Sequence, residues 1–227
     1  FREGQRDCIE AALNGRDVFC LMPTGGGKSM VYQLPAWCCP GLAVVFSPLV
    51  SLIQDQVDAM NAVGVRAAYF CASQGAQEVR DIMSELFHYP TNEQHSIHVG
   101  SKVKHVKLLY LTPERYSKSQ QLKSLLNSLL SKGLLSRFII DEAHCMSQWG
   151  HDFRPDYLSL QSLKTEFPSV PIMALTATAN KTVMADSIRT MKMRNPFKFT
   201  MSFNRPNLRY TVTKKGTPKA VITAIAS

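Results

Sequence analysis

A glycine-rich stretch directly after an apolar run constrains the fold of this chain more than any other feature. The stretch is Met22-Pro23-Thr24-Gly25-Gly26-Gly27-Lys28-Ser29, followed by a helical segment that Pro35 is expected to limit. Successive glycines allow a close backbone approach, so that N–H groups at the start of a helix can surround a phosphate. Lys28 would then reach the β- and γ-phosphates, and the Ser29 hydroxyl would bind Mg²⁺. The stretch predicts a phosphate-binding loop rather than a turn that only links a strand to a helix, although Met22 stands where the general motif has glycine.

Short apolar runs rich in β-branched residues alternate with segments of helical pattern along the chain. This alternation is typical of βαβ units, in which helices cover both faces of a parallel sheet. We therefore expect one α/β domain. The expected strands are 18–21, 42–46, 65–70, 106–111, 138–140 and 172–175, and the expected helices are 29–34, 49–63, 76–87, 121–130 and 181–191.

Two adjacent carboxylates, Asp141 and Glu142, follow the expected strand 138–140. Ligands gather at the carboxyl ends of the strands in a parallel sheet. Asp141 could hold the Mg²⁺ shell while Glu142 orients or deprotonates an attacking water. The alternative is an acidic helix start that the helix dipole favours. Because a phosphate loop lies upstream, we interpret this acidic pair as part of a site that hydrolyses a phosphoanhydride.

Basic residues outnumber acidic ones by 26 to 17, which gives a formal net charge of +9. This balance favours an anionic partner but does not identify it. Apolar runs such as 42–46 are far shorter than the roughly 20 residues that cross a bilayer. The N-terminus also lacks the pattern of a secretory signal. We therefore expect an intracellular protein without a membrane span.

The six cysteines show neither a CxxC pair nor the spacing of a disulfide framework. We interpret them as buried thiols rather than metal ligands. His95 and His98 have ligand-like spacing, but no neighbouring cluster completes a site, which favours a polar loop. Residues 89–104 are polar and are expected to form an exposed excursion, to which we assign no function.

In the phosphate loop and around the acidic pair, the sequence resembles superfamily 2 helicases and, more narrowly, the RecQ family of DNA helicases. The resemblance implies a RecA-like P-loop NTPase fold that binds ATP and Mg²⁺. Residues 22–29 resemble motif I, in which Met22 is ordinary for RecQ proteins, and 141–144 resemble motif II. The resemblance implies that nucleotide is bound by Arg2 and Gln5 of motif 0, which contact adenine, and by Thr24, Gly25, Gly26, Gly27, Lys28 and Ser29.

Further segments resemble motifs that contact or sense a nucleic-acid strand. Residues 47–56 and 112–114 resemble motifs Ia and Ib, which implies contacts with a nucleic-acid backbone. Residues 175–179, which include Thr176 and Thr178, resemble motif III, which couples the nucleotide state to the strand in this family. Basic side chains elsewhere could line a strand path or be merely solvated: Lys102, Lys104, Lys107, Lys181, Arg189, Lys192 and Arg194.

Residues 144–157, hereafter the aromatic loop, are the most discriminating stretch, because they are similar to the aromatic-rich loop of RecQ proteins. RNA helicases that share the motor lack it. On a polar loop, Trp149 and Phe153 can stack on unpaired bases, for roughly 1–3 kcal/mol per base. Arg154 can add charge or a cation–π contact, and we include Gln148 in this DNA-binding set. The alternative is that the aromatic side chains anchor the loop to the core.

The resemblance implies a first RecA-like lobe over 1–207, then a linker and the truncated start of a second lobe over 208–227. Expected strands at 197–203 and 208–212 lead into an apolar start at 220–226. An arginine that the family's second lobe supplies is worth about 10³ to 10⁵ in rate, so we expect weak nucleotide binding and very slow hydrolysis from this chain alone.

We therefore hypothesise that the chain is the motor lobe of an ATP-dependent 3′–5′ DNA helicase. Joined to its second lobe, it would unwind duplex DNA in repair and recombination. It would be nuclear in a eukaryote. Two alternatives remain open: a nucleotide-gated module that binds or anneals DNA strands, and an RNA helicase.

Overall fold

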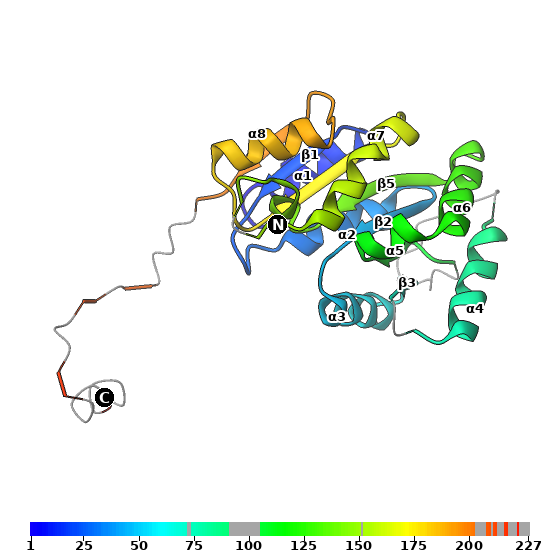
Figure 1. Ribbon diagram of the computed structural model, residues 1–227, viewed down its shortest axis with the longest axis horizontal. Helices are drawn as coiled ribbons and strands as arrows, with labels where there is room; N and C mark the ends of the chain where they lie inside the picture. The colour runs from blue at the N-terminus through cyan, green and yellow to red at the C-terminus, as the bar shows by residue number, and fades with distance from the viewer. Residues whose placement is uncertain are drawn as a thin grey trace.

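A seven-stranded sheet, all of whose strand pairs are parallel, forms the centre of the described part of the chain (Figure 1). The computed structural model describes residues 1–71, 74–90, 105–150 and 152–202, together with 208, 209, 211, 212, 216, 217 and 222. The strand order is β3-β4-β2-β5-β6-β1-β7. The strands are β1 (Val18–Leu21), β2 (Leu42–Phe46), β3 (Ala67–Phe70), β4 (Leu108–Leu111), β5 (Leu135–Ile140), β6 (Ile172–Thr176) and β7 (Phe197–Thr200).

Helices cover both faces of this sheet, as the sequence predicts. Alternate residues of β2 divide between two hydrophobic clusters, because successive side chains of a strand point to opposite faces. Val44 joins the cluster that packs under α4, α6, α7 and α8, whereas Val45 joins the one under α1, α2 and α3. The helices are α1 (Gln5–Leu13), α2 (Lys28–Cys38), α3 (Val50–Ala62), α4 (Ala76–Phe87), α5 (Pro113–Lys118), α6 (Gln120–Ser131), α7 (Leu163–Glu166) and α8 (Lys181–Thr190), with 3₁₀ helices η1 (Ala143–Met146) and η2 (Pro155–Ser162).

Several sequence-based expectations need correction. Pro35 does not limit α2, which continues to Cys38, because burial of Pro35 in the core offsets the one backbone hydrogen bond that proline cannot donate. Tyr89 is buried, with its ring edge against His105, whereas Pro90 is exposed, so the expectation of an exposed segment is wrong for Tyr89. Lys107 is buried and donates to the Cys39 carbonyl, so it cannot line a strand path.

Other expectations fall wholly or partly outside the described residues. Those for His95, His98, Lys102 and Lys104 do so entirely. The expected strand 197–203 ends at Thr200, and the described residues of 208–212 are not in a strand. Most of 208–227 is not described, so the linker and second-lobe assignment is untested. No helix within the described residues has the length and apolar character that crossing a bilayer requires.

Arg137 on β5 fixes the end of α1 from inside the protein. Its side chain is buried, and its guanidinium donates to the carbonyls of Ala12 at 2.5 Å and Arg16 at 2.9 Å. A cation at the C-terminal end of a helix satisfies carbonyls that lack helical partners and interacts favourably with the helix dipole. Burial lowers the pKa of Arg137 to about 10, which leaves the guanidinium charged at neutral pH. Arg137 thus positions the helix that begins beside the phosphate loop.

Candidate nucleotide-binding site

The phosphate loop and the acidic pair line one cavity of about 810 Å³. β1 delivers the loop and β5 delivers the acidic pair, and both strands end at the same edge because the sheet is parallel. The sequence-predicted residues in its wall are Arg2, Gln5, Thr24, Gly25, Gly27, Lys28, Ser29, Asp141 and Glu142. Gly26 is not among the lining residues, and its N–H donates to the Pro23 carbonyl at 2.9 Å.

The phosphate loop presents backbone N–H groups to this cavity. Gly25 and Gly27 adopt positive φ angles of 77° and 92°, which favour glycine. A Cβ atom on Gly27 would collide with the Gln5 side-chain amide. Among the described residues, no side chain caps the N-terminus of α2. The first N–H groups of α2 therefore remain available to an anion.

Two residues at the start of the chain are tied to this loop. The Arg2 guanidinium donates to the Gly25 carbonyl, and Gln5 Nε2 donates to the Gly27 carbonyl at 3.1 Å. The Arg2 backbone N–H donates to Gln5 Oε1 at 2.8 Å. The Lys28 side chain folds back over the loop and donates to the Met22 carbonyl at 3.3 Å. These contacts bring the motif 0 and motif I residues to one wall of the cavity.

The acidic pair has unequal electrostatics. Burial, and then the negative charge of Glu142, raise the pKa of Asp141 to about 6. Burial also opposes ionisation of Glu142, but the hydrogen bond from His144, together with the charge of Lys28, outweighs it and lowers the pKa of the Glu142 carboxyl. Glu142 is therefore a carboxylate at neutral pH, while Asp141 titrates close to neutrality in the absence of a bound cation.

His144 connects the acidic pair to motif III. Its Nδ1 atom lies 3.2 Å from Glu142 Oε2 and 2.7 Å from Thr176 Oγ1. Thr176 is buried, and its hydroxyl oxygen also accepts the Thr178 N–H at 3.1 Å. The structure therefore places Thr176 next to motif II, while Thr178 is exposed at the surface.

The aromatic loop leaves Trp149 72% exposed, which excludes a role for this side chain as a core anchor. Trp149 lines one hollow with Lys181 and Arg189 of α8, and a second with His144 and Thr178. Phe153 and Arg154 are partly buried and Gln148 is exposed. The sequence-predicted strand-binding residues thus lie on one loop that borders motif III, although Phe153 offers less of its ring than Trp149 does.

Some residues of the cavity escape sequence reasoning. Tyr32 and Tyr110 line it with their hydroxyl oxygens 3.4 Å apart. Their pattern is that of ordinary core residues, so no local signal separates them. Gln56, the last residue of motif Ia, also lines the cavity. Ser47, which begins motif Ia, lines this cavity as well, and its hydroxyl has no hydrogen-bond partner among the described residues. The end of β2 at Phe46 was the available signal, because ligands gather where parallel strands end.

Comparisons with known proteins agree with this architecture. The sequence pattern of the DEAD/DEAH box helicase family matches residues 2–186. The chain is 49% identical over 95% of its length to ATP-dependent DNA helicase Q-like 4B of Arabidopsis thaliana and 48% identical over 97% to RecQ-like DNA helicase BLM of Xenopus laevis. It is 42% identical over 98% to ATP-dependent DNA helicase RecQ of Haemophilus influenzae. It spans only 18%, 15% and 33% of these three relatives. The predicted resemblance to RecQ proteins is confirmed.

Solved structures show the same fold at low sequence identity. The Pyrococcus furiosus Hef helicase domain superposes with a TM-score of 0.56 at 14% identity, covering 91% of this chain and 39% of that one. The helicase MrfA bound to DNA and AMPPNP superposes with a TM-score of 0.59 at 14% identity, covering 87% of this chain and 26% of that one. The expected RecA-like fold is confirmed.

Proposed function

Because the chain belongs to the DEAD/DEAH box helicase family, we propose that it is the first motor lobe of an ATP-dependent DNA helicase of the RecQ type. The observation that carries this proposal is the shared cavity, in which an uncapped helix start faces two carboxylates. An exposed tryptophan on a loop that begins within motif II supports the DNA-binding half of the proposal.

The residues of the cavity fit a magnesium-bound nucleoside triphosphate. The glycine backbone leaves room and N–H groups for phosphates, and Ser29 and Asp141 offer oxygen ligands of the kind that Mg²⁺ prefers. When bound, ATP with Mg²⁺ supplies a phosphoanhydride that water can cleave. Lys28 would neutralise the phosphate charge, and Arg2 and Gln5 would hold the base.

Glu142 is suited to the role of proton acceptor. Its lowered pKa keeps it ionised at neutral pH, and its contact with His144 fixes the orientation of the carboxylate. A positioned general base contributes about 10² to 10⁴ in rate. In our proposal Glu142 accepts a proton from the attacking water, while Asp141 and Ser29 hold the metal.

The strand-binding surface combines aromatic and basic groups. Trp149 can stack on an unpaired base, and Lys181 and Arg189, in the same hollow, can contact its phosphates. Thr176 connects this side to Glu142 through His144. On the basis of the resemblance to RecQ proteins, we also propose that the complete helicase unwinds DNA with 3′–5′ polarity. We propose a role for it in repair and recombination, and a nuclear location in a eukaryote.

We further propose that 1–207 form this lobe and that 208–227 lead into a second RecA-like lobe. The last strand of the sheet ends at Thr200, and the chain spans 14–33% of its curated relatives, which leaves them ample length for such a lobe. Without the second lobe, the chain should bind nucleotide weakly and hydrolyse it very slowly.

Paired active-site variants test the proposal. With a second RecA-like lobe joined to the chain, Lys28→Ala should abolish ATP binding and hydrolysis. Glu142→Gln should keep nucleotide binding while hydrolysis falls at least 100-fold. Lys132→Ala, an exposed lysine at the end of α6, is the matched control. Wild-type hydrolysis in Lys28→Ala would contradict the proposal.

Unwinding assays on matched DNA and RNA duplexes, with a second RecA-like lobe joined to the chain, identify the substrate. The proposal predicts separation of the DNA duplex in preference to the RNA duplex. Preference for RNA would identify an RNA helicase, and ATP hydrolysis without strand separation would identify a strand-binding or annealing module.

A further inference from the structure

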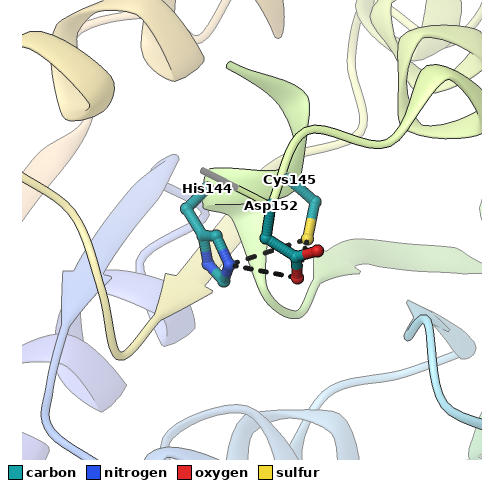
Figure 2. A group of neighbouring side chains, drawn as sticks. All are labelled: His144, Cys145 and Asp152. Carbon is teal, nitrogen blue, oxygen red and sulfur yellow. Dashed lines mark hydrogen bonds and ion pairs between the residues drawn. The ribbon is translucent and has the colours of Figure 1, made fainter. Parts of the chain in front are cut away.

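Three side chains outside the nucleotide cavity converge on one point (Figure 2). All three belong to the aromatic loop. His144 and Cys145 lie on η1, at the start of the loop, and Asp152 lies between η1 and η2. Cys145 Sγ lies 3.7 Å from His144 Nε2 and 3.6 Å from Asp152 Oδ2, and the last two atoms are 3.8 Å apart. Within the described residues, this is the one group of three or more such side chains close enough to share a metal ion.

The triangle has the dimensions of one face of a zinc tetrahedron. Zinc binds sulfur at about 2.3 Å and nitrogen or oxygen at about 2.0–2.2 Å, so that neighbouring ligands of a tetrahedral ion are about 3.4–3.6 Å apart. The observed separations differ from these values by no more than a few tenths of an ångström. We propose that His144 Nε2, Cys145 Sγ and Asp152 Oδ2 bind Zn²⁺, with the fourth position open to water. The thiol selects zinc over magnesium, which prefers oxygen ligands.

The surroundings of His144 prepare it for this role. Its Nδ1 atom faces the Glu142 carboxylate and the Thr176 hydroxyl. A carboxylate at this distance assigns the proton to Nδ1, which leaves the lone pair of Nε2 directed at Cys145 and Asp152. Zinc-bound histidines commonly donate their other N–H to such a partner, which fixes the ring and makes the ligand nitrogen more basic.

Charge and access also suit a divalent cation. Cys145 is buried, whereas the Asp152 side chain is 53% exposed and forms the open side of the group. Arg154 contacts Asp152 Oδ2 at 3.5 Å and could remain as its outer partner. Burial, and then the charge of Asp152, raise the pKa of Cys145 to about 12. Zinc would displace the thiol proton, and the thiolate and carboxylate would neutralise its two charges. This proposal revises our interpretation of Cys145 as a thiol without a metal-binding role.

Zinc would join the aromatic loop to motif II. It would bind Asp152 to His144, whose other nitrogen contacts Glu142. This consequence rests on the proposed function. It predicts that Zn²⁺ slows DNA-stimulated ATP hydrolysis by restricting the loop, and that Cys145→Ser removes this inhibition.

Binding is tested independently of activity, with Co²⁺ as a spectroscopic probe on the 227-residue chain after treatment with a chelator. The expected result is a thiolate-to-cobalt charge-transfer band with tetrahedral d–d bands, both lost on addition of Zn²⁺. Cys145→Ser should abolish the charge-transfer band. Asp152→Asn, at an exposed side chain that folding tolerates, should weaken Co²⁺ binding at least tenfold.

Cys38→Ser is the control, because Cys38 is a partly buried thiol that lies outside the proposed site. It should leave the band unchanged. A wild-type chain without the band, or a band that persists in both Cys145→Ser and Asp152→Asn, would overturn the site. Circular dichroism confirms that each variant is folded. If zinc binds the chain but ATP hydrolysis is absent even when a second RecA-like lobe is joined to it, the proposed function fails while the site stands.

Discussion

The Tyr157 hydroxyl, at the end of the aromatic loop, donates a hydrogen bond to the backbone carbonyl of Asp141 at 2.9 Å. Tyr157 is fully buried, and the bond itself is partly buried. It joins the segment that carries Trp149 directly to the acidic pair of the nucleotide cavity. The strand-binding and nucleotide-binding parts therefore share a rigid contact in addition to the one through His144.

Tyr157→Phe should remove this contact with little change in packing. The partly buried Asp141 carbonyl would lose the Tyr157 hydroxyl as a donor, which should lower the free energy of unfolding by about 1 kcal/mol. With the second lobe present, basal ATP hydrolysis should persist while stimulation by single-stranded DNA falls. Urea denaturation and ATPase assays with and without DNA measure the two effects. Full stimulation in Tyr157→Phe would show that the contact is structural only.

Trp149→Ala should separate DNA binding from stability. Because the side chain is 72% exposed, the free energy of unfolding should change by less than about 0.5 kcal/mol. Loss of one stacked base should weaken binding of single-stranded DNA by about 5- to 150-fold. Fluorescence anisotropy measures the affinity, and Trp149→Phe should retain most of it. Equal affinities for wild type and Trp149→Ala would rule out stacking by this residue.

Arg137→Met should destabilise the protein through α1. The buried bond to the Ala12 carbonyl and the partly buried bond to the Arg16 carbonyl are lost, and the end of the helix loses its cation, which together cost about 2–3 kcal/mol. A loosened α1 also misplaces Gln5, so we expect a higher KM for ATP with a smaller effect on kcat. Arg6→Ala, an exposed arginine of the same helix, should change stability by less than about 0.5 kcal/mol. Similar losses in both variants would contradict a specific role for Arg137.

Asp141→Asn should stabilise the chain at neutral pH when Mg²⁺ and nucleotide are absent. The folded-state pKa of about 6 lies above the ordinary value of 3.8, so the folded protein binds the proton more tightly than the unfolded chain does. Stability is therefore lost as the pH rises from about 4 to 6, and it stays lower above that window. Asparagine does not ionise and avoids this cost, which is on the order of 1–3 kcal/mol.

The pH dependence of the stability gained by Asp141→Asn shows whether ionisation of Asp141 is its cause. Urea denaturation with a chelator present should show the gain of Asp141→Asn at pH 7.5 and almost none at pH 3, below both pKa values, where Asp141 is mostly protonated in both states. An equal gain at both pH values would mean that ionisation of Asp141 is not its cause.

The strands were predictable because they are buried on both faces and therefore read as continuous apolar runs. β1 and β2 have the predicted bounds. α1 was not predicted, because it starts after Gly4 without a capping side chain and its first three residues are all polar. At Pro35 the sequence predicted the end of α2 too early, because burial of this proline in the core outweighs its local preference against helix.

The candidate site was predictable where it depends on strand ends. The phosphate loop and the acidic pair each follow a strand, so a parallel sheet brings them together. Arg137 carries no local signal, because its partners lie more than a hundred residues away in sequence. The convergence of His144, Cys145 and Asp152 depends on the path of an irregular loop, which periodicity does not describe.

The decisive measurement is a structure of the chain bound to a non-hydrolysable ATP analogue and Mg²⁺. We expect N–H groups of 24–29 to surround the β- and γ-phosphates, and we expect the Mg²⁺ ion to contact Ser29 Oγ with Asp141 in its coordination shell. An analogue bound away from the phosphate loop, or a metal ion that Asp141 does not approach, would contradict this expectation.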